Sequence, residues 1–152
     1  MPLIWDELSI GRNFRQEFNQ WSADDFPLTA PATITGFSLF IADGSDNDNG
    51  LLDNFNGTMS WAILSNVSGF PGTVLYSGDG TPTLTDLNQQ FLSNDISKAV
   101  LTLTAPISLT AGTYWVAFKE GTLSSTFDGS LLWLSYTGSA AGQGAVRFQT
   151  TE

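Results

Sequence analysis

Apolar residues recur at every second position in several short runs, which is the spacing of β-strands with one buried face. Gly, Pro, Asn and Asp separate these runs at intervals of roughly 8–12 residues, as in sandwiches and barrels. The clearest runs are residues 33–42, 58–65, 73–77, 99–104, 113–119, 131–137 and 145–150. The pattern predicts an all-β chain folded as an antiparallel, jelly-roll-like β-sandwich with at most one or two short helices.

The alternation within the runs also predicts which side chains face the core. We expect an inner face formed by Phe37, Leu39, Ile41, Met59, Trp61, Ile63, Leu101, Leu103, Tyr114, Val116 and Phe118. The intervening polar residues should then lie in solvent, namely Ser38, Ser60, Thr102, Thr104 and Lys119.

Two local features complete the expected fold. Phe70-Pro71-Gly72 matches a type II turn, with Pro at its second place and Gly at its third, just before a strand that opens at Thr73. The only helical candidates are residues 10–20 and 85–91, and both are too short to carry the fold.

Length and charge narrow the class of protein. The 152 residues, 41% hydrophobic and 13% charged, suit one globular domain spanning residues 1–152. A net charge of −10 with only five basic residues argues against nucleic acid as a partner. No apolar run reaches the ~20 residues that a membrane-spanning helix needs, so we expect no membrane span in this chain.

The chain has neither cysteine nor histidine, which excludes thiol nucleophiles, zinc–thiolate sites and histidine bases. Carboxylate pairs of the glycosidase type are the remaining catalytic option. Asp24 or Asp25 would pair with Glu17, Glu120 or Asp128, but fifteen acidic residues produce such pairs by chance. We therefore expect no enzyme.

The segment 43–53 crowds oxygen ligands between two strand-like runs. Its four carboxylates, with Asn side chains and Gly-freed carbonyls nearby, form the all-oxygen set that Ca²⁺ prefers; they are Asp43, Asp46, Asp48 and Asp53. The positions do not fit an EF-hand, so we expect an irregular calcium loop. The alternative is a solvated turn, which uses the same Asp, Asn and Gly residues.

Aromatic residues outside the alternation are candidate platforms for sugar rings. The candidate ligand-binding residues are Trp115, Trp133, Tyr136, Trp21 and Asp128. The alternative for each tryptophan is that it fills the core or covers a sheet edge, as large aromatics mostly do.

Five strings in order along the chain resemble the ectodomains of bacterial exported proteins with a PEP-CTERM sorting anchor. They are NQWSADDF (19–26), ATITG (32–36), GTMSWAI (57–63), GFPGTVLYS (69–77) and LTAGTYWV (109–116). The resemblance implies a secreted, non-catalytic β-sandwich from Gram-negative bacteria that make exopolysaccharide. The chain ends at residue 152 without the family's Pro-Glu-Pro segment, apolar helix and basic tail, so either the anchor was removed or the protein is released.

Together these features predict a secreted or cell-surface module, stabilised by calcium, that binds extracellular polysaccharide or matrix components. An alternative is self-association by strand addition into surface matrix or fibres, for which the N-terminal residues 3–6 are the suspected segment. A carboxylate-dependent glycoside hydrolase is a more distant alternative.

Overall fold

The computed structural model describes residues 20–43, 52, 55–91, 94–124, 131–134 and 146–149, and all its regular elements are strands. The nine strands are β1 (Gln20–Leu28), β2 (Ala32–Asp43), β3 (Met59–Val67), β4 (Phe70–Gly80), β5 (Thr83–Phe91), β6 (Asn94–Leu109), β7 (Gly112–Glu120), β8 (Leu131–Leu134) and β9 (Val146–Gln149). Within the described residues there is no helix that could cross a membrane.

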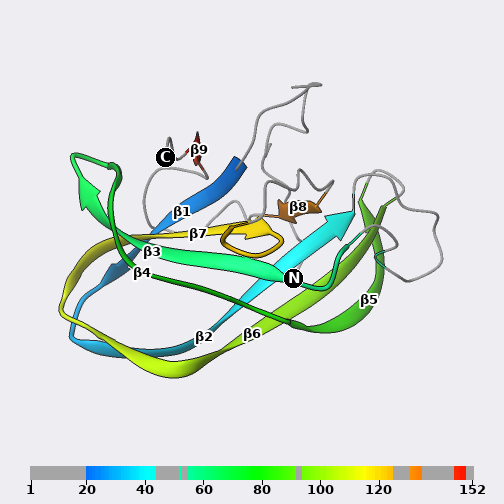
Figure 1. The fold of residues 1–152 in the computed structure, drawn as a ribbon, viewed down its shortest axis with the longest axis horizontal. Helices are drawn as coiled ribbons and strands as arrows, with labels where there is room; N and C mark the ends of the chain where they lie inside the picture. Colours follow the sequence, from blue (N-terminus) through cyan, green and yellow to red (C-terminus); the bar gives the residue numbers. More distant parts are fainter. Residues whose placement is uncertain are drawn as a thin grey trace.

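The strands form two antiparallel sheets that pack against each other, which confirms the predicted β-sandwich (Figure 1). One sheet has the order β4-β3-β7-β1-β9 and the other the order β5-β6-β2-β8. Short corners at residues 29–31 and 110–111 carry the chain from β1 to β2 and from β6 to β7, both at the same end of the molecule (Figure 1).

Every predicted run overlaps a strand, with residues 135–137, 145 and 150 outside the described residues, but two strands, β1 and β5, were missed. β1 escaped notice because Asp24, Asp25 and Pro27 interrupt its apolar pattern. Residues 85–91 belong to β5, so the prediction of a helix there was wrong: this segment pairs with β6 at the edge of its sheet and accommodates polar side chains in solvent. The other helical candidate, 10–20, lies outside the described residues except for Gln20, which begins β1.

The hairpin between β3 and β4 turns earlier than expected. Val67 pairs with Phe70, and the two residues between them have positive φ angles, 53° at Ser68 and 82° at Gly69, as in a type I′ turn. The predicted type II turn at 70–72 is therefore wrong, because these residues already belong to β4. Pro71 is tolerated there since β4 is an edge strand of its sheet.

The predicted inner face forms the inter-sheet core. Phe37 packs with its ring centroid 5.5 Å from that of Trp61 and 5.3 Å from that of Phe118. Two further groups of core residues extend from these rings, Leu39, Ile41 and Met59 towards one end and Ile63, Ile107 and Leu109 towards the other.

Ser60 and Lys119, expected in solvent, are both buried. They belong to the central strands β3 and β7, whose outer face carries a second apolar cluster formed by Trp21, Ala23, Ala62, Leu64, Trp115 and Ala117. Burial is compensated by bonding: Ser60 Oγ donates to the Gly121 carbonyl at 2.6 Å, and Lys119 Nζ donates to the Leu123 carbonyl at 2.9 Å. Simple alternation fails for a strand that is buried on both faces.

Candidate functional site

Two of the expected aromatic platforms are core residues. The Trp115 side chain is 0% exposed and donates its indole N–H to Asn66 Oδ1 at 3.0 Å. Trp21 is 6% exposed, and Lys119 Nζ lies 5.4 Å from its ring centroid. Neither ring offers an open face for a sugar, because both are buried and pack in the outer apolar cluster. These two tryptophans therefore fill the core, which is the alternative stated for each of them.

The structure does not describe the side chains of the remaining predicted ligand-binding residues. Trp133 belongs to β8, where its backbone pairs with Ile41. Tyr136 and Asp128 lie outside the described residues.

The predicted calcium loop is only partly described. Asp43 is the last residue of β2 and pairs with Leu131, whereas Asp46, Asp48 and Asp53 lie outside the described residues. Leu52 and Phe55, near the end of the loop, pack against the inter-sheet core.

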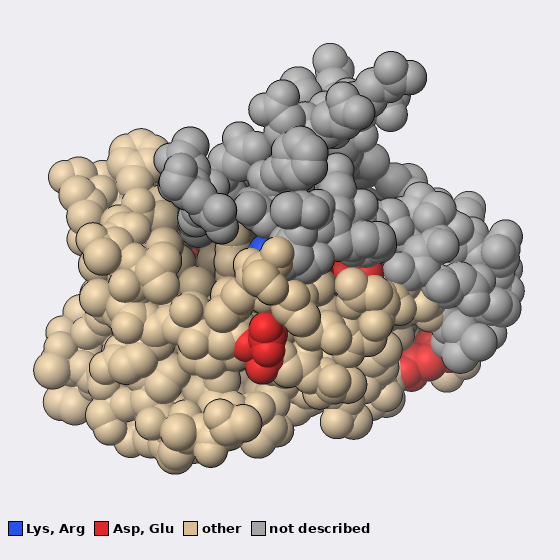
Figure 2. Space-filling view, viewed as in Figure 1, with Lys and Arg blue, Asp and Glu red and all other residues tan. Residues whose placement is uncertain are grey.

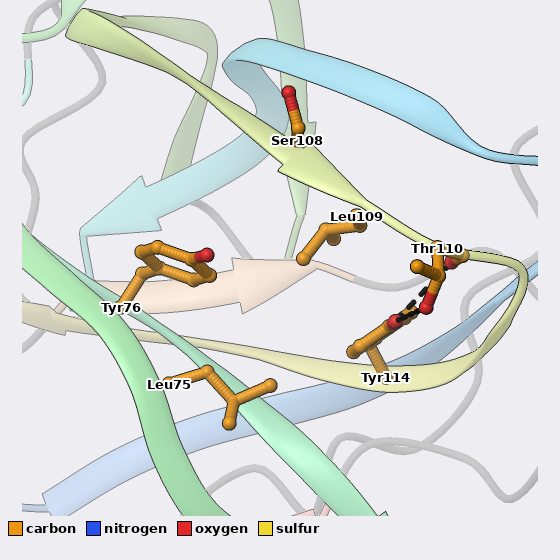
Figure 3. A pocket seen from close by; sticks show the side chains of 6 residues that line it. All are labelled: Leu75, Tyr76, Ser108, Leu109, Thr110 and Tyr114. Atoms are coloured by element: carbon orange, nitrogen blue, oxygen red, sulfur yellow. Dashed lines mark hydrogen bonds between the residues drawn. The ribbon is translucent and has the colours of Figure 1, made fainter.

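An open pocket of about 280 Å³ lies at the rim of the sandwich, between β4 and the corner that joins β6 to β7. Six described residues line it: Leu75, Tyr76, Ser108, Leu109, Thr110 and Tyr114. Figure 3 shows Leu75 and Tyr76 extending from β4 towards the space bounded by Leu109 and Tyr114. We call this opening the tyrosine pocket.

A β-bulge positions the β4 side of the tyrosine pocket. Ile63 and Leu64 of β3 pair with Tyr76 and Val74, so Leu75 is an extra residue in β4. A bulge re-aims side chains that would otherwise alternate, and this explains how the neighbours Leu75 and Tyr76 line the same pocket.

Tyr76 and Tyr114 share the inner face of their sheet. Tyr76 pairs with Ile63, which in turn pairs with Val116, and directly paired residues point to the same side. Tyr114 lies two residues before Val116 and therefore also faces inward. The pocket thus opens between the two sheets, where β6 crosses over the end of β7.

The Tyr114 ring is fixed at both ends. Its centroid lies 5.9 Å from that of Phe26, and its hydroxyl contacts Thr110 Oγ1 at 3.1 Å and donates to the Thr110 carbonyl at 3.2 Å (Figure 3). These two contacts span the β6–β7 corner. They hold the hydroxyl at the rim of the pocket rather than free in solvent.

The base of the tyrosine pocket is apolar and its rim is polar. Leu109 is buried and belongs to the same core cluster as Ile63 and Ile107. Tyr76, in contrast, is 43% exposed, so part of its side chain is accessible to a ligand. Apolar walls with a few convergent polar groups are typical of small-molecule binding sites.

The candidate catalytic carboxylates do not converge on the tyrosine pocket's lining. Asp24 and Asp25 pair with Val116 and Trp115, and Glu120 lies four residues beyond Val116, about 13 Å along the strand. The Glu120 side chain accepts a hydrogen bond from the Asn56 N–H at 2.8 Å. Glu17 and Asp128, the other candidates, lie outside the described residues.

Burial raises the pKa of Asp24, and the neighbouring Asp25 charge raises it further, although the Asp25 N–H donates to Asp24 Oδ1 at 3.0 Å and lowers it. Desolvation is the largest of these causes. A shifted titration is therefore expected for Asp24.

Sequence reasoning placed Tyr114 on the inner face but singled out neither Tyr76 nor Thr110. The one available signal was the run Val74-Leu75-Tyr76, three large apolar residues that break alternation next to an edge strand's turn.

Comparison with models of known protein families gives no match, and no curated protein matches the sequence.

Proposed function

We propose that the protein is a non-catalytic β-sandwich module that binds an extracellular polysaccharide or matrix component through the tyrosine pocket. The observation that carries the proposal is the exposed Tyr76 ring set opposite the fixed Tyr114 and Thr110 hydroxyls, over an apolar base.

Sugar rings match this chemistry because they have apolar C–H faces and a rim of hydroxyls. A tyrosine supplies both an apolar ring face and a polar tip, which suits a ligand that is apolar on one side and wet on the other. The volume of about 280 Å³ lies just below the range of ligand pockets, which run from about 300 to 1,000 Å³. The pocket is therefore suited to one or two sugar units of a longer chain.

Two sequence features support a secreted or surface location and stabilisation by calcium. Resemblance to exported proteins of exopolysaccharide-producing bacteria favours a secreted or surface location, and the acidic segment 43–53 favours stabilisation by calcium. Both are part of the proposal.

The direct test is binding of immobilised and soluble oligosaccharides, first on a glycan array and then by calorimetry. Tyr76→Ala should abolish retention, and Tyr76→Phe should keep most of it because the ring remains. Phe70→Ala is the matched control, since Phe70 is an exposed aromatic of the same strand that does not line the pocket. Equal retention by wild type and Tyr76→Ala, with both folded, would exclude the tyrosine pocket as the binding site.

Self-association is a second candidate function, favoured by apolar exposure at the β4 edge. Five large apolar residues of the β3–β4 hairpin are exposed: Val67, Phe70, Val74, Leu75 and Tyr76. Exposed apolar edge strands are templates for strand addition. The pairing of β4 with β3 is irregular at two places, one at Leu75 and one where Ser65 Oγ accepts a hydrogen bond from the Thr73 N–H. The regular stretch of β4 that a partner strand could pair with therefore runs from residue 76 to 80.

Size-exclusion chromatography over a wide concentration range separates the two candidates. Strand addition predicts a concentration-dependent shift in elution that Ser77→Lys suppresses, because a charge within the regular stretch of an edge strand opposes pairing. A constant monomeric elution volume would exclude self-association and leave glycan binding unaffected.

A further inference from the structure

We infer that the tyrosine pocket selects neutral, hydroxyl-bearing saccharides and rejects anionic ones such as uronates. This inference rests on the proposed function and names its ligand class. Three properties of the described residues carry it: the direction of the hydrogen bonds at the rim, the absence of charged lining residues, and the distribution of the basic residues.

The hydrogen bonds at the β6–β7 corner leave acceptors for the ligand. A tyrosine hydroxyl has one proton, and Tyr114 donates it to the Thr110 carbonyl. The 3.1 Å contact between Tyr114 and Thr110 Oγ1 is then satisfied when Thr110 donates. Both protons are used within the pair, while lone pairs remain on both oxygens.

An acceptor-rich rim discriminates between ligands by their donors. A saccharide hydroxyl can donate to the lone pairs of Tyr114 or Thr110. A carboxylate, sulfate or phosphate has oxygen acceptors alone when ionised, so its oxygens would face lone pairs at Tyr114 and Thr110 and could accept only from the Tyr76 and Ser108 hydroxyls of the described lining. Unmatched acceptors in a partly buried site cost binding free energy.

The described lining contains no charged side chain that could compensate an anion. Lys98 lies ten residues from Ser108 along β6, about 33 Å of strand. Lys119 lies five residues beyond Tyr114 on β7, which places it on the opposite face of the sheet. Arg147 lies on β9, two strands beyond β7.

The net negative charge of the whole chain also disfavours anionic ligands. Its net charge is −10, and on the described surface in Figure 2 the visible charges are mostly acidic, within a largely uncharged face. A negative potential lowers the local concentration of anionic ligands and has no such effect on neutral ones.

The test uses the whole protein and matched oligosaccharides measured by calorimetry. Each pair consists of a neutral hexose tetrasaccharide and its counterpart in which the C6 hydroxymethyl groups are oxidised to carboxylates. We expect the neutral member to bind at least about tenfold more tightly, with an affinity unchanged between low salt and about 0.5 M salt. Equal or tighter binding of the oxidised member at both salt concentrations overturns the inference.

The Tyr114→Phe variant tests the role of the corner hydrogen bonds. It keeps the ring but removes one acceptor, so neutral binding should weaken roughly two- to tenfold, the range expected for one hydrogen bond. It also releases the Thr110 hydroxyl proton, which can then be donated to a carboxylate. The preference for the neutral ligand should therefore narrow, and an unchanged preference contradicts the hydrogen-bond argument.

The Tyr76→Ala variant distinguishes a failure of the proposed binding function from a failure of the inferred preference for neutral ligands. If Tyr76→Ala leaves the binding of both ligand types unchanged, the tyrosine pocket is not the site, and the proposed function and the inference fall together. If Tyr76→Ala abolishes binding but the oxidised ligand binds as well as the neutral one, the binding function stands and the neutral preference is overturned.

Discussion

The indole Nε1 of Trp115 donates a 3.0 Å hydrogen bond to Oδ1 of Asn66, a residue 49 positions earlier in the chain. Trp115 is the largest fully buried side chain described, and its only polar atom is satisfied by a residue at the end of the neighbouring strand β3. Trp115, which the sequence suggested as a binding platform, therefore has a structural role in the core.

Replacing Asn66 by Ala should lower the free energy of unfolding by about 1–3 kcal/mol, because the buried indole N–H loses its acceptor. Chemical denaturation followed by tryptophan fluorescence measures the change. Gln89→Ala, at an exposed position of β5, is the control and should have little effect. A loss no larger than that of Gln89→Ala would show that water replaces the acceptor without cost.

Gly36 should resist substitution even by alanine. A Cβ atom there would lie 2.6 Å from the Leu101 carbonyl oxygen, a backbone atom that cannot move aside alone. We expect Gly36→Ala to destabilise the protein by more than about 2 kcal/mol through strain between β2 and β6.

Gly80→Ala is the matched control for Gly36→Ala. Its nearest contact would be the Leu101 Cδ1 atom at 3.1 Å, the end of a flexible side chain that can shift. Thermal melts of the two variants should therefore differ clearly, and equal melting temperatures would contradict the steric argument.

Asp24→Asn should stabilise the protein at neutral pH and make its stability less dependent on pH. Burial raises the pKa of Asp24 in the folded state above its ordinary value of 3.8, so the folded protein holds this proton more tightly than the unfolded chain. Stability from this group is present at low pH and is lost as pH rises from the unfolded pKa through the folded pKa.

The gain at pH 7 should stay below about 1 kcal/mol, because Asp24 is only partly buried and solvent screens it. Asparagine keeps the Oδ1 acceptor for the Asp25 N–H. Denaturation curves between about pH 3 and 7 measure the effect, and a variant that is less stable than wild type at pH 7 would refute it.

Calcium should raise the melting temperature if the segment 43–53 binds it. At a hundred times its dissociation constant a ligand adds about 2.7 kcal/mol, which corresponds to roughly 5–10 °C for a chain of this length. The combined substitution Asp46→Ala and Asp48→Ala should remove the shift in calcium and leave the melting temperature in chelator unchanged. Equal losses in both buffers would instead assign these residues a role in the turn itself.

The sequence predicted the strands whose apolar residues alternate, because one buried face leaves a period of two that is readable residue by residue. Phe37, Leu39 and Ile41 illustrate this on β2, and all three lie in the inter-sheet core. β1 could not be recognised in the same way, since Asp24 and Asp25 interrupt its apolar pattern and are held in the strand by pairing with Val116 and Trp115 of β7.

Tertiary structure alone decided which aromatics are available to a ligand. Trp115 is buried because β7 lies in the middle of its sheet and the outer face there carries a packed apolar cluster, a relationship that no local pattern encodes. Tyr76 is exposed because β4 lies at the edge and carries a bulge. The tyrosine pocket itself joins β4 to the β6–β7 corner through side chains more than thirty residues apart, so it exists only once the two sheets have packed.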